Sequence, residues 1–513
     1  MSFSFEALRK QFPNTFAAFS QLPDGGSATI AHLYHLDRRY QQARTLPIPE
    51  PDQRAQPVGS FDVVLAGGGL SLIYAAFLSM RGLRVAVFDR RAIGCGHREW
   101  NISRKELIPL SQSGLFSEQE VAKLILLQYR TGICRFGQGT NYAVSGVLDC
   151  VVDAETLLAR LRARCLDHGV TLLPHRELVD YSLDARGVTI RLASTDGSQR
   201  LEQLQARLML DGLGATSPHA RFDLCCPTVG GVMDDLAIGS DPLEMDPEVG
   251  EILVTTEGIE QRRQHIWEGF PTVSALSDAH STRRMTIYLF YYLRSDALSE
   301  HGPLPLLSLY ERYFETLPRY KRGPLRLVRP TYGYIPAYTR LGPMPASPCE
   351  RVFLVGDAAG RHSPLTFCGF GSMIRSFLPI GDGLLRLLAR DQLDSSSLES
   401  LWQEPPALKV LGGLTLMMSP PLSSDGADQP DTINELLNAA FSTLYAMGEE
   451  TYRRFLQDDV DGPTFVRFML GSAQQHPEVY RKVFRYLSLS EVTTWLYRLW
   501  QLQRSPRSEH ETR

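Results

Sequence analysis

Residues 61–89 read FDVVLAGGGLSLIYAAFLSMRGLRVAVFD, and this stretch decides the fold. The mostly apolar run from Phe61 to Ala66 is typical of a strand that is buried on both faces of a parallel sheet. A Gly-rich turn follows, then a helical pattern from Ile73 to Arg81 and a second apolar run from Arg84 to Phe88. The pattern predicts a β-α-β unit of the size that binds dinucleotides.

The turn of this unit carries glycines where a pyrophosphate needs them. Gly67, Gly68 and Gly69 are consecutive, and Leu72 stands where the G-x-G-x-x-G pattern has its third glycine. The first glycine allows a tight turn, and Gly69 lets the backbone approach a pyrophosphate at the N-terminus of the next helix. Because the third glycine is replaced, we expect the helix and the strand to lie slightly further apart.

A carboxylate ends the second predicted strand. Asp89 lies 22 residues after Gly67, where a side chain can accept hydrogen bonds from both ribose hydroxyls of an adenosine. We assign Asp89 and the adjacent Arg90 to the cofactor site. A helix cap or a solvated strand end is the alternative for Asp89.

Two further strand ends extend this pattern from a dinucleotide to FAD. Residues 208–217 read LMLDGLGATS, with Asp211 and Gly212 after the strand, and residues 352–360 read VFLVGDAAG, with Gly356 and Asp357. Both segments resemble motifs of the group-2 flavoprotein superfamily, which includes aromatic hydroxylases, geranylgeranyl reductases and lycopene cyclases. The resemblance implies non-covalently bound FAD, with Asp357 on its ribityl chain.

A helix is predicted directly after the second of these motifs. The superfamily pattern Pro-x-x-x-x-Gly-x-Gly corresponds to Pro364, Gly369 and Gly371, and the helical pattern begins at Ser372. The resemblance implies that this helix N-terminus points at the pyrimidine end of the isoalloxazine. There its dipole would stabilise the negative charge of reduced flavin.

Three stretches of sequence resemble one particular family within this superfamily. Residues 356–377 read GDAAGRHSPLTFCGFGSMIRSF, residues 265–271 read HIWEGFP, and residues 285–293 read MTIYLFYYL. They look like the CruA/CruP-type lycopene cyclases of photosynthetic organisms, with CruP the nearer in size, over roughly residues 58–390. This resemblance implies carotenoid biosynthesis: an acid-initiated, redox-neutral cyclisation of a polyene end group, with reduced FAD stabilising the carbocation and NAD(P)H as the donor that reduces the flavin.

Such chemistry needs an acid kept protonated by burial, a wall that stabilises positive charge, and exclusion of water. Glu268 is our candidate acid, because it lies between Trp267 and a Gly-Phe-Pro run; a strand-end charge beside a core tryptophan is the alternative. His265 is a candidate proton relay and His362 a candidate donor to the flavin ring, and each has a purely structural alternative. Aromatic side chains at 288, 290 and 292 alternate and are expected to share a strand face that lines a polyene pocket or packs in the core.

The fold class expected from these patterns is α/β: a Rossmann-type FAD-binding domain, an antiparallel substrate domain and a helical C-terminal region. Long single helices are expected over 5–22, 28–45, 432–458 and 477–502. The expected boundaries are 1–57 for an N-terminal helical appendage and linker, 58–224 and 341–390 for the two parts of the FAD-binding domain, 225–340 for the substrate domain, and 391–513 for the helical region.

The amino-acid composition limits which kinds of partner we expect for the protein. The chain has 513 residues, 43% hydrophobic and 21% charged, with a formal net charge of −4, as in a soluble globular protein without affinity for nucleic acid. Eight scattered cysteines form no Cys-x-x-Cys, so we expect buried thiols and no metal site. With neither a signal peptide nor an apolar run of about 20 residues, we expect a cytoplasmic or peripherally membrane-associated protein. The oligomeric state is not indicated.

Three functions stay open. The first is the cyclase-like reaction on a carotenoid or other isoprenoid. The second is an FAD/NAD(P)H-dependent oxidoreductase, a monooxygenase or a reductase, on an isoprenoid, carotenoid or aromatic substrate, which would consume NAD(P)H in step with product. The third is a non-catalytic paralogue that binds flavin and carotenoid, in which Glu268→Gln would leave every function intact.

Overall fold

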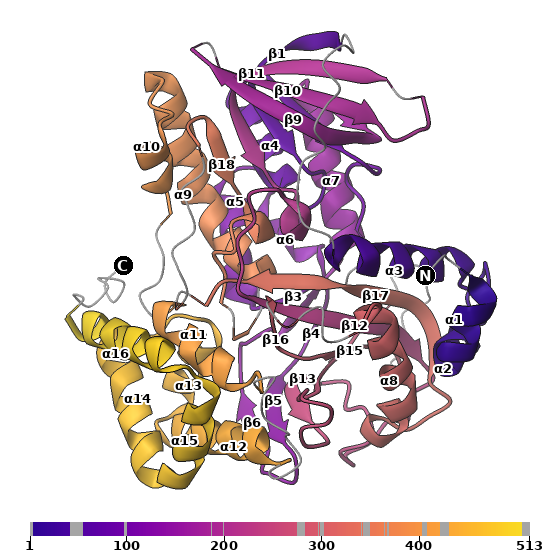
Figure 1. The fold of residues 1–513 in the computed structure, drawn as a ribbon, viewed down its shortest axis with the longest axis vertical. Helices are drawn as coiled ribbons and strands as arrows, with labels where there is room; N and C mark the ends of the chain where they lie inside the picture. Colours follow the sequence, from indigo (N-terminus) through magenta and orange to yellow (C-terminus); the bar gives the residue numbers. More distant parts are fainter. Residues whose placement is uncertain are drawn as a thin grey trace.

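A computed structural model shows two large sheets joined by a small third sheet, with helices at both ends of the chain (Figure 1). The structure describes residues 4–41, 55–96, 100–185, 187–198, 200–273, 283–295, 297, 302–339, 341, 349–363, 365–366, 369–402, 408–420 and 430–504.

The first sheet is the predicted Rossmann-type sheet. Its seven strands run in the order β8-β2-β1-β11-β10-β9, and β18 pairs with β11. β1 pairs in parallel with both β2 and β11, so the carboxyl ends of these strands lie at one edge. The strands are β1 (Gln56–Ala66), β2 (Val85–Asp89), β8 (Thr171–Pro174), β9 (Arg176–Asp184), β10 (Gly187–Ser194), β11 (Leu201–Asp211) and β18 (Val352–Leu354).

Three helices share the apolar core of this sheet. They are α4 (Leu72–Met80), α7 (Ala154–Asp167) and α9 (Gly369–Arg390). Eight of the nine residues of α4 are buried, as expected for a helix enclosed between a sheet and other helices.

The second sheet has eight strands in the order β16-β12-β15-β14-β13-β5-β6, with β17 also paired to β12. The predicted boundary at 225 misses β5 and β6, which come from the first FAD-binding segment. The sheet is mixed rather than antiparallel, because β13 pairs with β5 in parallel. Its strands are β5 (Thr131–Phe136), β6 (Tyr142–Val144), β12 (Leu224–Asp234), β13 (Val249–Thr255), β14 (Ile266–Pro271), β15 (Met285–Phe290), β16 (Leu293–Arg294) and β17 (Arg326–Ala337).

A small sheet of β3 (Trp100–Ile102), β7 (Cys150–Val152) and β4 (Ile125–Gln128) connects the two large ones. Short helical turns lie beside it and pack against α9: η1 (Arg104–Leu107) and α5 (Ile108–Gln112), with α6 (Glu118–Ala122) next to α5.

The N-terminal helices are part of the main body and not an appendage. The single helix predicted over 5–22 is two helices, α1 (Phe5–Gln11) and α2 (Pro13–Phe19), because Pro13 can begin a helix but cannot continue one. α2 and α3 (Ser27–Gln41) pack on α8 (Pro305–Tyr320), which covers one face of the second sheet. Buried Asp37 joins them, since it accepts the backbone N–H groups of Leu306 and Leu307.

The C-terminal region is helical, as predicted, but its helices are shorter. Gly448 has φ +102°, a value that favours glycine, and it separates two helices where one was predicted over 432–458. The helix predicted over 477–502 is also interrupted, and α14 lies in the region predicted to be helical, although its bounds were not predicted. The helices are α10 (Ser395–Glu399), α11 (Leu408–Met417), α12 (Thr432–Ala446), α13 (Glu449–Leu456), α14 (Gly462–Gln475), α15 (Pro477–Val483), η5 (Phe484–Tyr486) and α16 (Leu489–Arg504).

None of the helices in the described ranges combines the length and the apolar composition that crossing a bilayer requires. The predicted α/β class, with its Rossmann-type sheet, second sheet and helical C-terminal region, is confirmed.

Candidate active site

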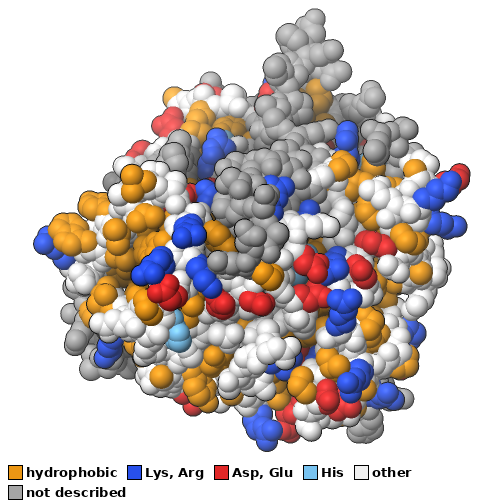
Figure 2. Space-filling view, turned by 60° about the horizontal axis from the view of Figure 1, so that its bottom comes forward, with side chains coloured by type: hydrophobic (Ala, Val, Ile, Leu, Met, Phe, Trp, Pro, Cys, Tyr) orange, Lys and Arg blue, Asp and Glu red, His pale blue; other side chains and the backbone are white. Residues whose placement is uncertain are grey.

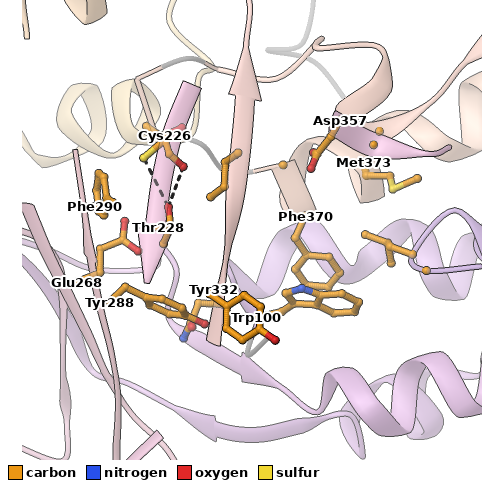
Figure 3. A pocket seen from close by; sticks show the side chains of 18 of the residues that line it. Trp100, Cys226, Thr228, Glu268, Tyr288, Phe290, Tyr332, Asp357, Phe370 and Met373 are labelled. Atoms are coloured by element: carbon orange, nitrogen blue, oxygen red, sulfur yellow. Dashed lines mark hydrogen bonds between the residues drawn. The ribbon is translucent and has the colours of Figure 1, made fainter. Parts of the chain in front are cut away.

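A cavity of about 330 Å³ lies where the carboxyl ends of the first sheet meet the second sheet. Its size is that of a small-molecule site, and its position beyond the strand ends is where open α/β sheets bind ligands. One wall consists of glycine-rich turns and the other is mostly aromatic. Figure 3 shows Glu268 and Phe290 on one side and Asp357 and Met373 on the other.

The turn after β1 brings the backbone close to the neighbouring strand end. Gly67 has φ +106°, and a Cβ atom there would lie 2.4 Å from the carbonyl oxygen of Gly212, so only glycine fits. Gly69 lines the cavity, and a Cβ atom on it would meet nothing within 4 Å. The turn therefore exposes bare backbone to the cavity at Gly69.

Asp89 holds the shape of this turn. Its carboxylate accepts the N–H of Gly68 at 2.8 Å and that of Arg91 at 2.7 Å. Asp89 and Arg90 are half-buried at the end of β2, outside the set of residues that line the cavity. Their contact with an adenosine ribose stays a prediction.

Asp211 and Gly212, which were paired in the sequence motif, have different surroundings. Asp211 is buried and accepts the N–H of Leu213 at 3.0 Å and the hydroxyl of Ser217 at 2.5 Å. Burial raises the pKa of this carboxyl. Gly212 and Gly214 line the cavity, whereas Asp211 fixes the loop that carries them.

The third motif supplies the other end of the glycine-rich wall. Gly356 and Asp357 lie in the turn η4 (Gly356–Ala358), and both line the cavity. α9 begins at Gly369, where a Cβ atom would lie 3.3 Å from a carboxylate oxygen of Asp357. Gly371 faces away, since a Cβ there would lie 2.9 Å from the Glu106 carboxylate. Pro364, the remaining residue of this motif, lies outside the described residues.

This wall fits FAD. Turns from three distant segments converge on one cavity, which Gly69, Gly212 and Gly356 line, and at Gly69 the missing side chain leaves open space. The N-terminus of the 22-residue helix α9 borders the same cavity, and the dipole of a helix favours a negative charge at this end.

The opposite wall places a carboxyl among aromatic side chains. Glu268 in β14 is paired with Tyr288 in β15, and both line the cavity together with Phe270 and Phe290. Burial raises the pKa of Glu268 to about 8. The carboxyl is therefore protonated at neutral pH, in surroundings that are mostly apolar.

The two predicted histidines do not line the cavity. His265, directly before β14, and Trp267 in it lie on the side opposite Glu268, and the His265 ring contacts Tyr291 at 5.7 Å between centroids. Burial and the charges of nearby arginines lower the pKa of His265 to about 3, so it is neutral. His362 is buried beside the η4 loop. The structure does not bring either histidine together with Glu268 in the described cavity.

Several residues that line the cavity belong to no sequence motif, so they could not be predicted. Trp100 of β3 stacks on Phe370 of α9, with 4.8 Å between ring centroids, and Tyr332 of β17 lies between them and Glu268 (Figure 3). Tyr292 was expected to join Tyr288 and Phe290, but its hydroxyl donates to the Leu365 carbonyl and it does not line the cavity. β15 ends at Phe290, so the alternation of faces does not extend to Tyr292.

The chain is similar to solved structures at low sequence identity, while no protein-family model and no curated protein matches it. A geranylgeranyl bacteriochlorophyll reductase-like protein from Thermoplasma acidophilum gives a TM-score of 0.52 at 13% identity, covering 84% of this chain and 100% of that one. The halogenase PltM, in complex with phloroglucinol and FAD, gives 0.54 at 12%, covering 85% and 98%. The p-nitrophenol 4-monooxygenase PnpA from Pseudomonas putida gives 0.52 at 14%, covering 78% and 97%.

Identities this low establish the fold alone. The fold is shared by an FAD-bound halogenase, a monooxygenase and a reductase-like protein, and the glycine-rich wall described above lies at its strand ends. The chain has the fold of the FAD-dependent hydroxylases.

Proposed function

We propose that this protein is an FAD-dependent oxidoreductase that reduces a carbon–carbon double bond of an apolar, isoprenoid-type substrate, with NAD(P)H as the electron donor. One observation carries the proposal: a glycine-rich wall that fits FAD and a protonated carboxyl, Glu268, line the same cavity. The reductase-like protein of the same fold supports this class of reaction.

The glycine-rich wall would hold the cofactor. The backbone at Gly69 and Gly212 would take the pyrophosphate, Asp357 the ribityl chain, and the N-terminus of α9 the isoalloxazine. Bound FAD would supply the electron pair that such a reduction requires. The dipole of α9 favours a negative charge at its N-terminus, which lowers the free energy of a reduced, anionic flavin there.

The aromatic wall would bind the substrate and keep water out. Phe270, Tyr288 and Phe290 offer apolar faces on which an unsaturated chain can lie, and their π-electrons stabilise positive charge on carbon. Glu268 holds a proton on its carboxyl at neutral pH and can donate it to one carbon of a double bond, which leaves the positive charge on the neighbouring carbon.

A redox-neutral cyclisation of a polyene end group is the second candidate. The combination of a neutral Glu268 with aromatic faces at Tyr288 and Phe290 favours it, because an acid and a cation-stabilising wall are what protonation-initiated ring closure needs. The two candidates differ in their electron balance: reduction adds two hydrogen atoms to the substrate, whereas cyclisation gives an isomer of unchanged mass.

The test is incubation of the purified, FAD-loaded protein with NADPH and either geranylgeraniol or lycopene under anaerobic conditions. A product heavier by two hydrogens, formed one per NADPH consumed, would establish the reductase. An isomer formed without stoichiometric NADPH consumption would establish the cyclase. Protein that stays colourless after incubation with FAD would overturn both.

Glu268→Gln is the matched active-site variant. We expect it to bind FAD like the wild type and to lose turnover, whereas Glu155→Gln, an exposed carboxylate on α7, should lose nothing. Flavin uptake with no conversion of either substrate by the wild type would favour the non-catalytic paralogue.

A further inference from the structure

The C-terminal helix α16 has one buried face and one exposed apolar face. Trp495 and Leu502 point inward and are buried in the core, and the indole N–H of Trp495 donates to the Val410 carbonyl at 2.8 Å. The exposed apolar side chains are spaced at 0, 7, 8 and 11 positions along the helix, which places them on the outer side. They are Leu489, Leu496, Tyr497 and Trp500, with exposed fractions of 81, 53, 53 and 46%.

The chemistry of this outer face is that of a membrane interface. Tyr497 and Trp500 stack with 5.9 Å between their ring centroids, and the Arg504 guanidinium lies 3.8 Å from the centroid of Trp500. Tryptophan, tyrosine and leucine flanked by arginine are the side chains that enter the headgroup region of a bilayer from a helix lying in its plane.

The segment that ends in α16 has a positive net charge, unlike the whole protein, although Arg481 pairs with Glu478 and Lys482 pairs with Glu435. Residues 462–504 contain six Lys and Arg side chains against two Glu, whereas the complete chain has a net charge of −4. Arg467 on the adjoining helix α14 and Arg481 and Arg485 before α16 are exposed. Figure 2 shows hydrophobic side chains gathered on one side of the molecule with Lys and Arg side chains next to them. A basic segment of this kind is attracted to anionic lipid.

A second copy of the chain fits this face less well. Four side chains of this size, three of them about half exposed and Leu489 81% exposed, present roughly 400 Å². A partner in a standard protein interface contributes about 800 Å², and like-charged basic segments would repel one another. An apolar patch on a single helix, with Arg504 against Trp500 and further cations in the preceding residues, therefore favours a lipid surface.

The docking face is linked to the cavity through one apolar core. Trp495 and Leu502, on the inner face of α16, belong to the same cluster of buried side chains as Phe270 and Phe290 of the cavity wall. We propose that the outer face of α16, together with the basic side chains beside it, docks this protein on an anionic bilayer surface. Docking would hold the part of the molecule that carries the aromatic cavity wall next to the bilayer, in which apolar substrates dissolve.

The test is flotation of the full chain with vesicles of phosphatidylcholine alone or with 30% phosphatidylglycerol. We expect binding to the anionic vesicles at 50 mM NaCl, and a partition coefficient at least tenfold lower at 0.5 M NaCl because salt screens the basic segment. The double variant Leu496→Ser/Trp500→Ser should bind at least tenfold more weakly at both salt concentrations. Arg481→Glu/Arg485→Glu should weaken binding to the anionic vesicles at low salt.

Matched controls carry equivalent changes elsewhere. Leu166→Ser/Ile238→Ser replaces two side chains that are 54 and 46% exposed outside the C-terminal region, and it should bind vesicles like the wild type. Equal binding by the α16 double variant and this control, or no vesicle binding by the wild type, would overturn the proposal. So would self-association of the wild type that Leu496→Ser/Trp500→Ser abolishes, since a second copy would then be the occupant.

Two further measurements test whether each variant is folded and still binds FAD. Circular dichroism and melting temperature show that each variant is folded, and FAD titration of the same samples shows that the cofactor site is intact. Because neither vesicle binding nor its loss depends on flavin, failure of the docking proposal is distinguishable from failure of the proposed reaction.

Discussion

Glu268 and Tyr288 face each other across strands β14 and β15, and both side chains enter the cavity that Asp357 enters from the other side. The second sheet thus contributes a candidate proton donor, and the first sheet contributes the candidate cofactor loops, to one cavity. Neither sheet holds both parts, so any reaction that uses them depends on how the two sheets are packed together.

Replacing Glu268 by Gln should remove the acid without removing the fold. We expect turnover to fall by about 10²–10⁴, the usual contribution of a positioned acid, with FAD affinity unchanged. Since burial raises the pKa of Glu268 to about 8, wild-type turnover should be constant at lower pH and fall as pH rises through 8. A pH–rate profile checks this. Retention of the alkaline limb in Glu268→Asn or Glu268→Gln would assign it to another group.

The same pKa shift predicts an effect on stability. Glu268 titrates near 4.5 when unfolded and near 8 when folded, so between these values the folded state binds more protons and stability falls as pH rises. The cost is absent below about pH 4.5 and complete above 8. Apoprotein carrying Glu268→Gln should therefore melt higher, relative to wild type, at pH 9 than at pH 4. An equal difference at both pH values would show that the carboxyl is not desolvated.

Two neighbouring glycines should respond differently to an added side chain. Gly69→Val places its side chain in open cavity, so we expect apoprotein of normal melting temperature whose FAD affinity is at least tenfold lower. Gly67→Ala forces a Cβ atom to within 2.4 Å of the Gly212 carbonyl oxygen at a positive φ, so we expect a less stable fold. Calorimetry and flavin titration separate the two effects. Normal FAD affinity in Gly69→Val would exclude this turn from the cofactor site.

The cofactor wall could be predicted from sequence because its requirements are local. A buried strand followed directly by Gly67 or Gly356 specifies a turn at a strand end, whatever the rest of the chain does. Asp211 also follows a strand as the motif requires, but its side chain forms hydrogen bonds within its own loop, so its contact with the cofactor stays a prediction.

The other wall depends on strand pairing, which sequence patterns do not fix. Tyr288 and Phe290 could be placed on one face by alternation, but no pattern shows that Trp100 and Tyr332, far apart in the chain, close the same cavity. The sequence did indicate that the side chains of His265 and Glu268 point in opposite directions. His265 is three residues from Glu268, and an odd separation along a strand places two side chains on opposite faces.

The ion pair between Arg375 and Glu106 should contribute to the joint between α9 and the small sheet. Glu106 also accepts the N–H of Ser103 at 3.0 Å, and the Ser103 hydroxyl accepts the N–H of Leu148, which lines the cavity. Arg375→Met leaves a mostly buried carboxylate without its cation, so we expect a loss of about 2 kcal/mol, between the values for exposed and buried pairs. Thermal melts of the apoprotein measure it.

The exposed pair of Arg130 and Glu248 is the matched control for this change. Both side chains are more than half exposed, so Arg130→Met should cost at most about 1 kcal/mol. Adding Glu106→Gln to Arg375→Met should recover part of the loss, because the uncompensated charge is then removed. If the two arginine variants lower the melting temperature equally, Arg375 does not brace α9 against the cavity wall, and the cofactor helix must be held there by its apolar face alone.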